Sequence, residues 1–440
     1  MVHRMKNRTL FSIAALALFA TLQVAAATYL VETDHPDCLY QCGETATFTV
    51  TVLETNGVAA TSGSIAITLD NFGPAVQTNA VFNLAEANPF HVSGSLSEPG
   101  FLRIALPNAD KGPNHFSVGF EPERIVKGSP SPSDFDDFWA GQRQKLAREI
   151  PLDPQLERVP KRCTEDFEFF RISFATFGRR VYGYLSIPTD KTKAPFPVWF
   201  GVNSAGFGNW TNDMQGRPDA IRAQFSVYPF PPDWRFNEIG LKEKFNAMNA
   251  DCNARYGSGY ATAGLAHERE DYFFLPVALG LDRAVDWIAA RPDADPSRFW
   301  YDGTSQGGGF GFYLCGLNHH FTRAIFFVPA ITDTMGWLAG RRSGWPRIEE
   351  SARGDDARLE AIKRNAPYYD AANFASRIQC PVRVGVGFSD TTCPPCAVYA
   401  AYNEIKVADK GIRNGIGMTH GVSQEMQNEL RQWLKGDEAK

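Results

Sequence analysis

A serine between glycines, at residue 305, is suited to nucleophilic chemistry. The segment 303–307 reads Gly-Thr-Ser-Gln-Gly, with an apolar stretch (298–301) before it and a helical stretch after it. In the G-x-S-x-G pattern the serine lies on a tight strand-to-helix turn that raises its hydroxyl above a sheet. Ser305 is therefore the predicted nucleophile of an acyl-transfer reaction, and the backbone amide of Gln306 is a predicted oxyanion donor.

The serine needs a base to remove its proton, and an imidazole is suited to that task. In the α/β-hydrolase order, an acid and then a histidine follow the serine, and three histidines follow residue 305. His319 and His320 lie at or just past the end of the helix after the serine, which carries them away from it. His420 lies in a Gly-rich loop (415–421) before the last helix and is the predicted base.

The acid is expected at the end of a strand between the serine and the base. Residues 382–388 form an apolar, β-rich run, and Asp390 follows it closely. A carboxylate there can hold the tautomer of the imidazole. Asp370 precedes this strand and fits a helix cap or a surface position, whereas Asp333 follows the strand after the elbow helix, where some proteins of this fold carry the acid. Asp390 is favoured, with Asp333 and Asp370 as alternatives.

A second oxyanion donor is expected from the loop after an earlier strand. The segment 200–206 fits, because a strand runs into a loop that contains glycine and small residues. The backbone amide of Val202 is the predicted donor. Serine-based acyl transfer of this type requires neither a metal nor an organic cofactor.

The elements that must position these residues follow a Pro/Ser linker at 128–132. Apolar strands are predicted at 196–201, 245–248, 298–301, 324–328 and 382–388, and helices at 279–290 and from about residue 422. Strands that alternate with helices indicate a mostly parallel sheet covered on both faces. The sequence therefore predicts an α/β-hydrolase fold for a catalytic domain at 121–440.

Residues 28–120 follow a different pattern, of period two. Ala46, Phe48 and Val50 alternate with threonines, and glycine-containing turns separate the apolar runs. Such alternation is typical of half-buried strands, and several short strands without helices predict a small Ig-like β-sandwich domain. This domain carries no catalytic motif. Its sequence fits a carbohydrate-contacting module and a structural appendage equally well.

Residues 1–27 have the pattern of a signal peptide. A basic start precedes an apolar run at 10–22 and three alanines at 25–27, which is the order of a charged region, an apolar region and a cleavage site. The apolar run is too short to span a bilayer comfortably. We expect a secreted or periplasmic protein that is not attached to a membrane after cleavage.

Composition limits the partners of the chain. The 440 residues are 44% hydrophobic and 21% charged with a net charge of −5, so a mildly acidic globular protein is expected, and nucleic acid and anionic membranes are disfavoured. A bridge between Cys38 and Cys42 is expected among the eight cysteines. Cys393 and Cys396 have metal-site spacing without a second pair, so a bridge or free thiols are expected there rather than zinc.

From about residue 121 to its end, the chain resembles the acetyl xylan esterase and cephalosporin C deacetylase family, carbohydrate esterase family seven. The resemblance is carried by residues 135–139, 178–188, 303–308 and 387–395, and the last of these (Gly-Phe-Ser-Asp-Thr-Thr-Cys-Pro-Pro) is the most specific. It adds support for Asp390. It implies a serine esterase for acetyl esters of carbohydrates such as acetylated xylan or xylo-oligosaccharides, which can form homo-oligomers.

Two departures from the family pattern bear on the substrate. The Arg-Gly-Gln motif of the family is missing, since the nearest segment (253–257) reads Asn-Ala-Arg-Tyr-Gly, and Gly421 follows His420 where the family usually has glutamate. Esters with other acyl groups, or peptides, therefore stay as alternative substrates. A degenerate carbohydrate-binding protein is a further alternative, against which the presence of Ser305, Asp390 and His420 argues.

Overall fold

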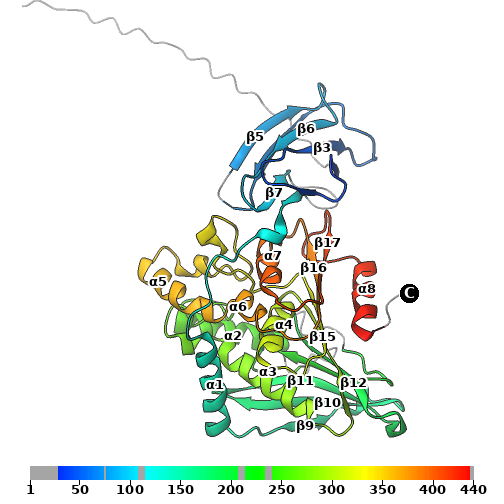
Figure 1. Ribbon diagram of the computed structural model, residues 1–440, viewed down its shortest axis with the longest axis vertical. Coiled ribbons are helices and arrows are strands. Elements are labelled where there is room, and N and C mark those ends of the chain that lie inside the picture. Colours follow the sequence, from blue (N-terminus) through cyan, green and yellow to red (C-terminus); the bar gives the residue numbers. More distant parts are fainter. Residues whose placement is uncertain (1–27, 74–75, 108–113, 207–213, 233–239, 437–440) are drawn as a thin grey trace, which may run out of the picture.

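The computed structural model describes residues 28–73, 76–107, 114–206, 214–232 and 240–436. The predicted signal peptide lies outside the described residues. Within the described ranges, no helix combines the length and apolarity that a membrane span needs. These ranges hold two small sheets and one large sheet, shown in Figure 1.

The two small sheets form an N-terminal lobe, blue to cyan in Figure 1. One has the strand order β1-β3-β6 and the other β2-β8-β7-β4-β5. Alternate side chains of β3 are buried, among them Phe48, Val50 and Val52, as the period-two pattern predicts. The strands are β1 (Thr28–Thr33), β2 (Leu39–Tyr40), β3 (Ala46–Leu53), β4 (Ser64–Asp70), β5 (Val76–Asn83), β6 (Phe90–Gly94), β7 (Gly100–Ala105) and β8 (His115–Phe120).

A nine-stranded sheet of order β17-β16-β15-β14-β12-β13-β11-β10-β9 is the centre of the larger lobe. Strands β12 to β17 pair in parallel, whereas β9, β10 and β11 join antiparallel at one end. The strands are β9 (Gln155–Arg158), β10 (Phe167–Thr176), β11 (Arg179–Pro188), β12 (Phe196–Val202), β13 (Ile221–Ser226), β14 (Ala294–Thr304), β15 (Arg323–Phe327), β16 (Val382–Gly387) and β17 (Lys410–Gly415).

Helices cover both faces of this sheet. Trp199 and Trp300 point to one face and pack near α8, whereas the next residues, Phe200 and Tyr301, point to the other face, where α3 and α4 lie. The predicted mostly parallel, two-sided α/β architecture is confirmed. The helices are α1 (Phe135–Glu149), α2 (Leu241–Tyr256), α3 (Phe274–Ala289), α4 (Gln306–Leu317), α5 (Asp356–Asn365), α6 (Ala371–Ala375), α7 (Pro395–Glu404) and α8 (Gln424–Lys435).

One predicted strand is wrong. Residues 245–248 lie inside α2, and the strand between β12 and β14 in the chain is β13. Leu241, Met248 and Cys252 are the buried residues of α2, at a spacing that places them on one side of a helix. A four-residue apolar run does not distinguish a strand from part of a helix, which explains the error.

The cysteines are all free thiols, so the expected bridge between Cys38 and Cys42 is wrong. The Cys38 sulfur lies instead 3.3 Å from the hydroxyl of Thr33. Cys393 and Cys396, for which a bridge or free thiols were the two expectations, are likewise free and buried.

Candidate active site

Ser305 lies at the bend between β14 and α4, with φ 55° and ψ −120°. A residue with a side chain rarely adopts positive φ, and such strain persists where the surrounding structure enforces it. A Cβ at Gly303 would lie 2.5 Å from the carbonyl oxygen of Gly307, and a Cβ at Gly307 would lie 2.1 Å from that of Val202. These backbone contacts require glycine on both sides of the serine, as the sequence pattern predicts.

Ser305, His420 and Asp390 form a continuous hydrogen-bonded path. The Ser305 Oγ atom lies 2.9 Å from Nε2 of His420, and Nδ1 of the same ring lies 2.8 Å from Oδ2 of Asp390. An ionised carboxylate only accepts hydrogen bonds, so Nδ1 carries the ring proton and Nε2 accepts from the serine hydroxyl. The structure thus brings the three predicted residues together from three separate loops.

The turn after β16 orients Asp390. Its Oδ1 accepts the backbone N–H groups of Thr392 at 2.8 Å and Cys393 at 2.9 Å, which leaves Oδ2 for the imidazole. Asp390 is completely buried, whereas the side chain of His420 is 35% exposed. The imidazole therefore has the buried carboxylate on one side and access to solvent and substrate on the other.

The alternative acids and bases are engaged elsewhere. Asp333 forms an ion pair of 2.8 Å with Arg341. Asp370 is the N-cap of α6, and burial, followed by the charge of Asp333, raises the pKa of the Asp370 carboxyl to about 7. His319 and His320 are exposed residues just after α4.

The loop after β12 lies against the elbow. The side-chain amide of Gln306 lies 3.3 Å from the carbonyl oxygen of Asn203. The backbone N–H of Asn203 donates to Phe225 in β13 at 3.0 Å. Successive N–H groups of a strand point to opposite edges, so the N–H of Val202 points toward β14, the strand that leads into Ser305.

An open hollow of about 440 Å³ gives access to the serine. Its lining residues are Ser204, Ala205, Thr304, Ser305, Trp345, Thr392 and His420. Ser305 itself is only 7% exposed. A small ester group that enters this hollow reaches both the serine hydroxyl and the imidazole.

Two residues near the triad were missed by the sequence reasoning. The buried hydroxyl of Tyr260 donates to Oε1 of Gln306 at 2.9 Å, and Tyr260 therefore fixes the residue whose amide is a predicted oxyanion donor. Trp345 lines the hollow. Both lie in long connections without a periodic pattern, so the available signal was only their aromatic character.

Asp390, Cys393 and His420 form the one cluster of metal-ligand type found among the described residues, with ligand atoms within 4.8 Å of one another. The carboxylate oxygens that a metal would need are already used in hydrogen bonds. Oδ1 of Asp390 accepts hydrogen bonds from two N–H groups, and Oδ2 accepts one from the imidazole. Burial also raises the pKa of the Cys393 thiol, which disfavours the thiolate that a metal requires. These contacts fit a catalytic triad and do not fit a metal centre.

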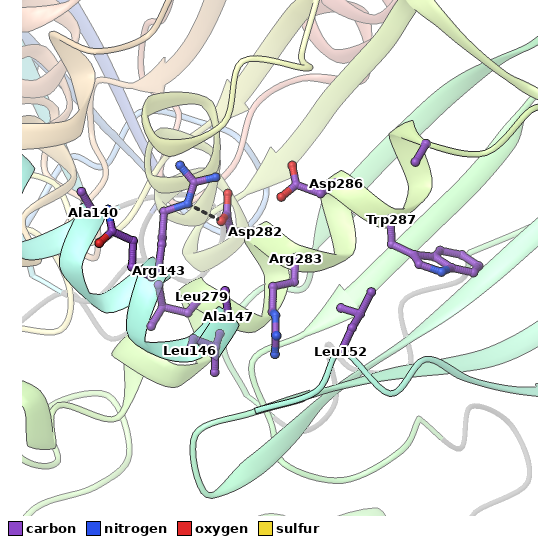
Figure 2. A pocket seen from close by; sticks show the side chains of 12 residues that line it. Ala140, Arg143, Leu146, Ala147, Leu152, Leu279, Asp282, Arg283, Asp286 and Trp287 are labelled. Carbon is purple, nitrogen blue, oxygen red and sulfur yellow. Dashed lines mark ion pairs between the residues drawn. The ribbon is translucent and has the colours of Figure 1, made fainter. Parts of the chain in front are cut away.

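A second hollow, of about 690 Å³, lies between α1 and α3 (Figure 2). Its walls carry apolar side chains and an ion pair between Arg143 and Asp282, whose Nε and Oδ2 atoms are 2.8 Å apart. Serine, cysteine and histidine are missing from its lining residues. Because it offers no activated nucleophile, the smaller hollow at Ser305 is the candidate active site.

Two features are typical of one class of protein. One is the helix-covered, mostly parallel sheet, and the other is a serine at a strand-to-helix bend beside a histidine and a buried aspartate. These features define an α/β-hydrolase whose chemistry is acyl transfer.

Comparison with known proteins identifies the family. Residues 125–436 match the acetyl xylan esterase family, and the chain belongs to it. The chain is 28% identical over 412 residues to the acetyl esterase Axe7A of Xylanibacter ruminicola, covering 92% of this chain and 90% of that protein. The chain is thus a carboxylic-ester hydrolase. The match to Axe7A extends beyond residues 125–436 and so includes part of the N-terminal lobe.

Solved structures give the same fold for the larger lobe. Acetyl xylan esterases from a Paenibacillus and a Thermoanaerobacterium species are 21% and 20% identical to this chain, each with a TM-score of 0.59. Each match covers 72% of this chain and 98% of the other protein. The predicted α/β-hydrolase fold is confirmed.

Proposed function

We propose that this protein hydrolyses acetyl esters of carbohydrates, with Ser305 as nucleophile, His420 as base and Asp390 as the acid. The hydrogen-bonded path from Ser305 through His420 to Asp390 carries this proposal. Membership of the acetyl xylan esterase family, and the similarity to an acetyl esterase, support acetylated xylan or xylo-oligosaccharides as the substrate class.

In the first half-reaction, Nε2 of His420 takes the hydroxyl proton while Oγ of Ser305 attacks the acetyl carbonyl carbon. The backbone amides of Gln306 and Val202 donate hydrogen bonds to the oxyanion, and each such donor stabilises the transition state by about 3 kcal/mol. The bond between the acyl carbon and the sugar oxygen then breaks. The sugar alcohol leaves with the proton from His420, and an acetyl-serine remains.

In the second half-reaction, His420 removes a proton from water, and the resulting hydroxide attacks the acetyl-serine. The bond between the acyl carbon and Oγ breaks, the proton on His420 returns to Ser305, and acetic acid leaves and ionises to acetate in water. Asp390 stabilises the imidazolium in both halves and keeps its Nδ1 proton in place. These steps use no group beyond the chain and water.

We propose that residues 1–27 direct export and that residues 28–120 and 121–440 are the two domains of the secreted or periplasmic protein. The order of basic, apolar and small residues supports a leader. Edman sequencing of the exported protein tests whether residues 1–27 are removed, with Thr28 expected as the first residue. An exported protein that keeps its first residues would contradict the cleavage.

Ser305→Ala tests the proposed mechanism. We expect hydrolysis of p-nitrophenyl acetate to fall by about 10⁴-fold or more, because the nucleophile is removed. Ser297→Ala, at the opposite end of β14, is the matched control and should keep wild-type turnover. Turnover by Ser305→Ala at the wild-type rate, or failure of a fluorophosphonate to label the wild type at Ser305, would contradict the proposal.

A further inference from the structure

The turn that carries Asp390 is in direct contact with the N-terminal lobe. Phe388 and Ser389, which precede the acid, are fully buried. The Ser117 hydroxyl of β8 donates to the carbonyl oxygen of Phe388, and Nε2 of His115 lies 2.5 Å from that of Ser389. The N-terminal lobe therefore holds the two carbonyl groups that come immediately before the acid.

The contacting residues share one face of the five-stranded sheet. His115 and Ser117 are two positions apart on β8 and point the same way. Phe101 of β7 is paired with Gly119, the next position on that face, and its ring meets the ring of Phe388 edge-on at 5.0 Å. A Cβ at Gly119 would lie 3.2 Å from the Phe101 ring. This face is thus shaped to receive the turn.

The hydrogen bond from His115 to Ser389 places a proton on Nε2 of the ring. A carbonyl oxygen only accepts, so Nε2 must carry a proton. Burial lowers the pKa of His115. Nδ1 lies 2.9 Å from Oδ1 of Asn114. His115 is therefore held by a neighbour in its own lobe while it donates to Ser389.

The same lobe reaches the loop that carries the base. The N–H of Ser389 donates to the carbonyl oxygen of Met418 at 2.8 Å, two residues before His420. A Cβ at Gly417 would lie 3.3 Å from the Phe116 ring of β8. Movement of Ser389 would therefore displace the acid and the base together.

We propose that the N-terminal lobe is a positioning element of the active site, in which His115 and Ser117 hold the backbone before Asp390. The proposal rests on the triad proposed above. Misplacement of a catalytic group by about 1 Å lowers a rate by about 100-fold, even when the cause lies far from the reacting atoms. Neither His115 nor Ser117 lines the serine hollow, so they act through Asp390 and not on the substrate.

The test compares His115→Ala, Ser117→Ala and the double variant in the full chain. His91→Ala is the matched control, because His91 is an exposed histidine of β6 in the other small sheet and contacts Thr49. With p-nitrophenyl acetate, which has no sugar chain, we expect kcat of the double variant to fall about tenfold or more. KM should change less than twofold, and His115→Gln, which restores an N–H donor, should recover part of kcat.

A kcat of the folded double variant within twofold of the wild type would overturn the proposal. A loss confined to acetylated xylan would also overturn it, because that result indicates a carbohydrate-contacting lobe. If the double variant does not fold, Ser117→Ala, which loses only a hydroxyl, is used instead. A rate of fluorophosphonate labelling at Ser305 within twofold of the wild type would then overturn the proposal. An active Ser305→Ala would refute the triad itself, whereas an inactive Ser305→Ala beside a fully active double variant refutes only the positioning role.

Discussion

At the residue scale, Trp345 is the largest side chain among those that line the serine hollow. Its backbone is held on both sides, because its N–H donates to Thr392 at 3.1 Å and its carbonyl oxygen accepts from Ile331 at 2.7 Å. We expect a wall fixed in this way to limit the length of the acyl group that can reach Ser305.

Trp345→Ala should therefore broaden acyl-chain selectivity. We expect the ratio of kcat/KM for p-nitrophenyl octanoate to that for the acetate ester to rise on the order of tenfold, because the space left by Trp345 would bury about two further methylenes at about 0.8 kcal/mol each. Trp337→Ala, from the same connection but outside the hollow, is the control. An unchanged preference for acetate in Trp345→Ala would remove Trp345 as the limit on chain length.

The sequence predicted the residues of the proposed triad because each has a signal in the chain: a turn of glycines for Ser305, the end of an apolar strand for Asp390, and chain order for His420. Tyr260 has no such signal. Its bond to Gln306 joins positions that are 46 residues apart, and no pattern of spacing reports such a contact. The bond from His115 to Ser389, between positions 274 residues apart, was beyond prediction for the same reason.

At the element scale, the elbow depends on close approach between β12 and the start of α4. The carbonyl oxygen of Val202 occupies the space that a side chain at Gly307 would need. Gly309 is similarly restricted, since a Cβ there would lie 2.2 Å from the carbonyl oxygen of Ala330. The glycines after the serine therefore allow the start of α4 to pack closely against the backbone at Val202 and Ala330.

Gly307→Ala should separate β12 from the elbow and shift the two proposed oxyanion donors. We expect kcat to fall more than about 100-fold and the free energy of unfolding to fall by about 1–3 kcal/mol, as in other overpacked sites. Gly141→Ala, on α1 where an added Cβ meets nothing within 4 Å, is the control and should be fully active. An active Gly307→Ala would show that the close contact is dispensable.

Elements with clear periodicity were predicted well, and those without it were not. The apolar run at 382–388 corresponds to β16. A continuous β-rich apolar run is typical of a strand that is buried on both faces of a parallel sheet. The run at 245–248 became part of α2 because its helical partners, Leu241 and Cys252, lie outside the short window that suggested a strand. Tertiary packing decided that case.

At the scale of the whole molecule, buried charge makes the stability depend on pH. Asp282 on α3 is 3% exposed and pairs with Arg143 on α1 (Figure 2). Burial raises the pKa of its carboxyl from 3.8 to about 6. Between these two values the folded chain binds more protons than the unfolded chain, so this group lowers the stability as the pH rises from about 4 to about 6.

Asp282→Asn should remove this decline. The free energy of unfolding, measured with urea at several values of pH, should fall between pH 4 and 6 in the wild type relative to the variant, and the difference should be constant above pH 7. Asp286→Asn, on the same helix and half-exposed, should retain the wild-type decline. Parallel curves for wild type and Asp282→Asn would contradict the assignment.

The contact between the two lobes also limits where a truncated form of the protein can begin. A fragment that begins at residue 125, where the family match starts, contains every residue of the proposed triad but loses the partners of Phe388 and Ser389. The Phe388 ring, now fully buried, would face water, and its apolar surface would favour aggregation. We expect an expression library built on family boundaries to yield this fragment in insoluble or inactive form.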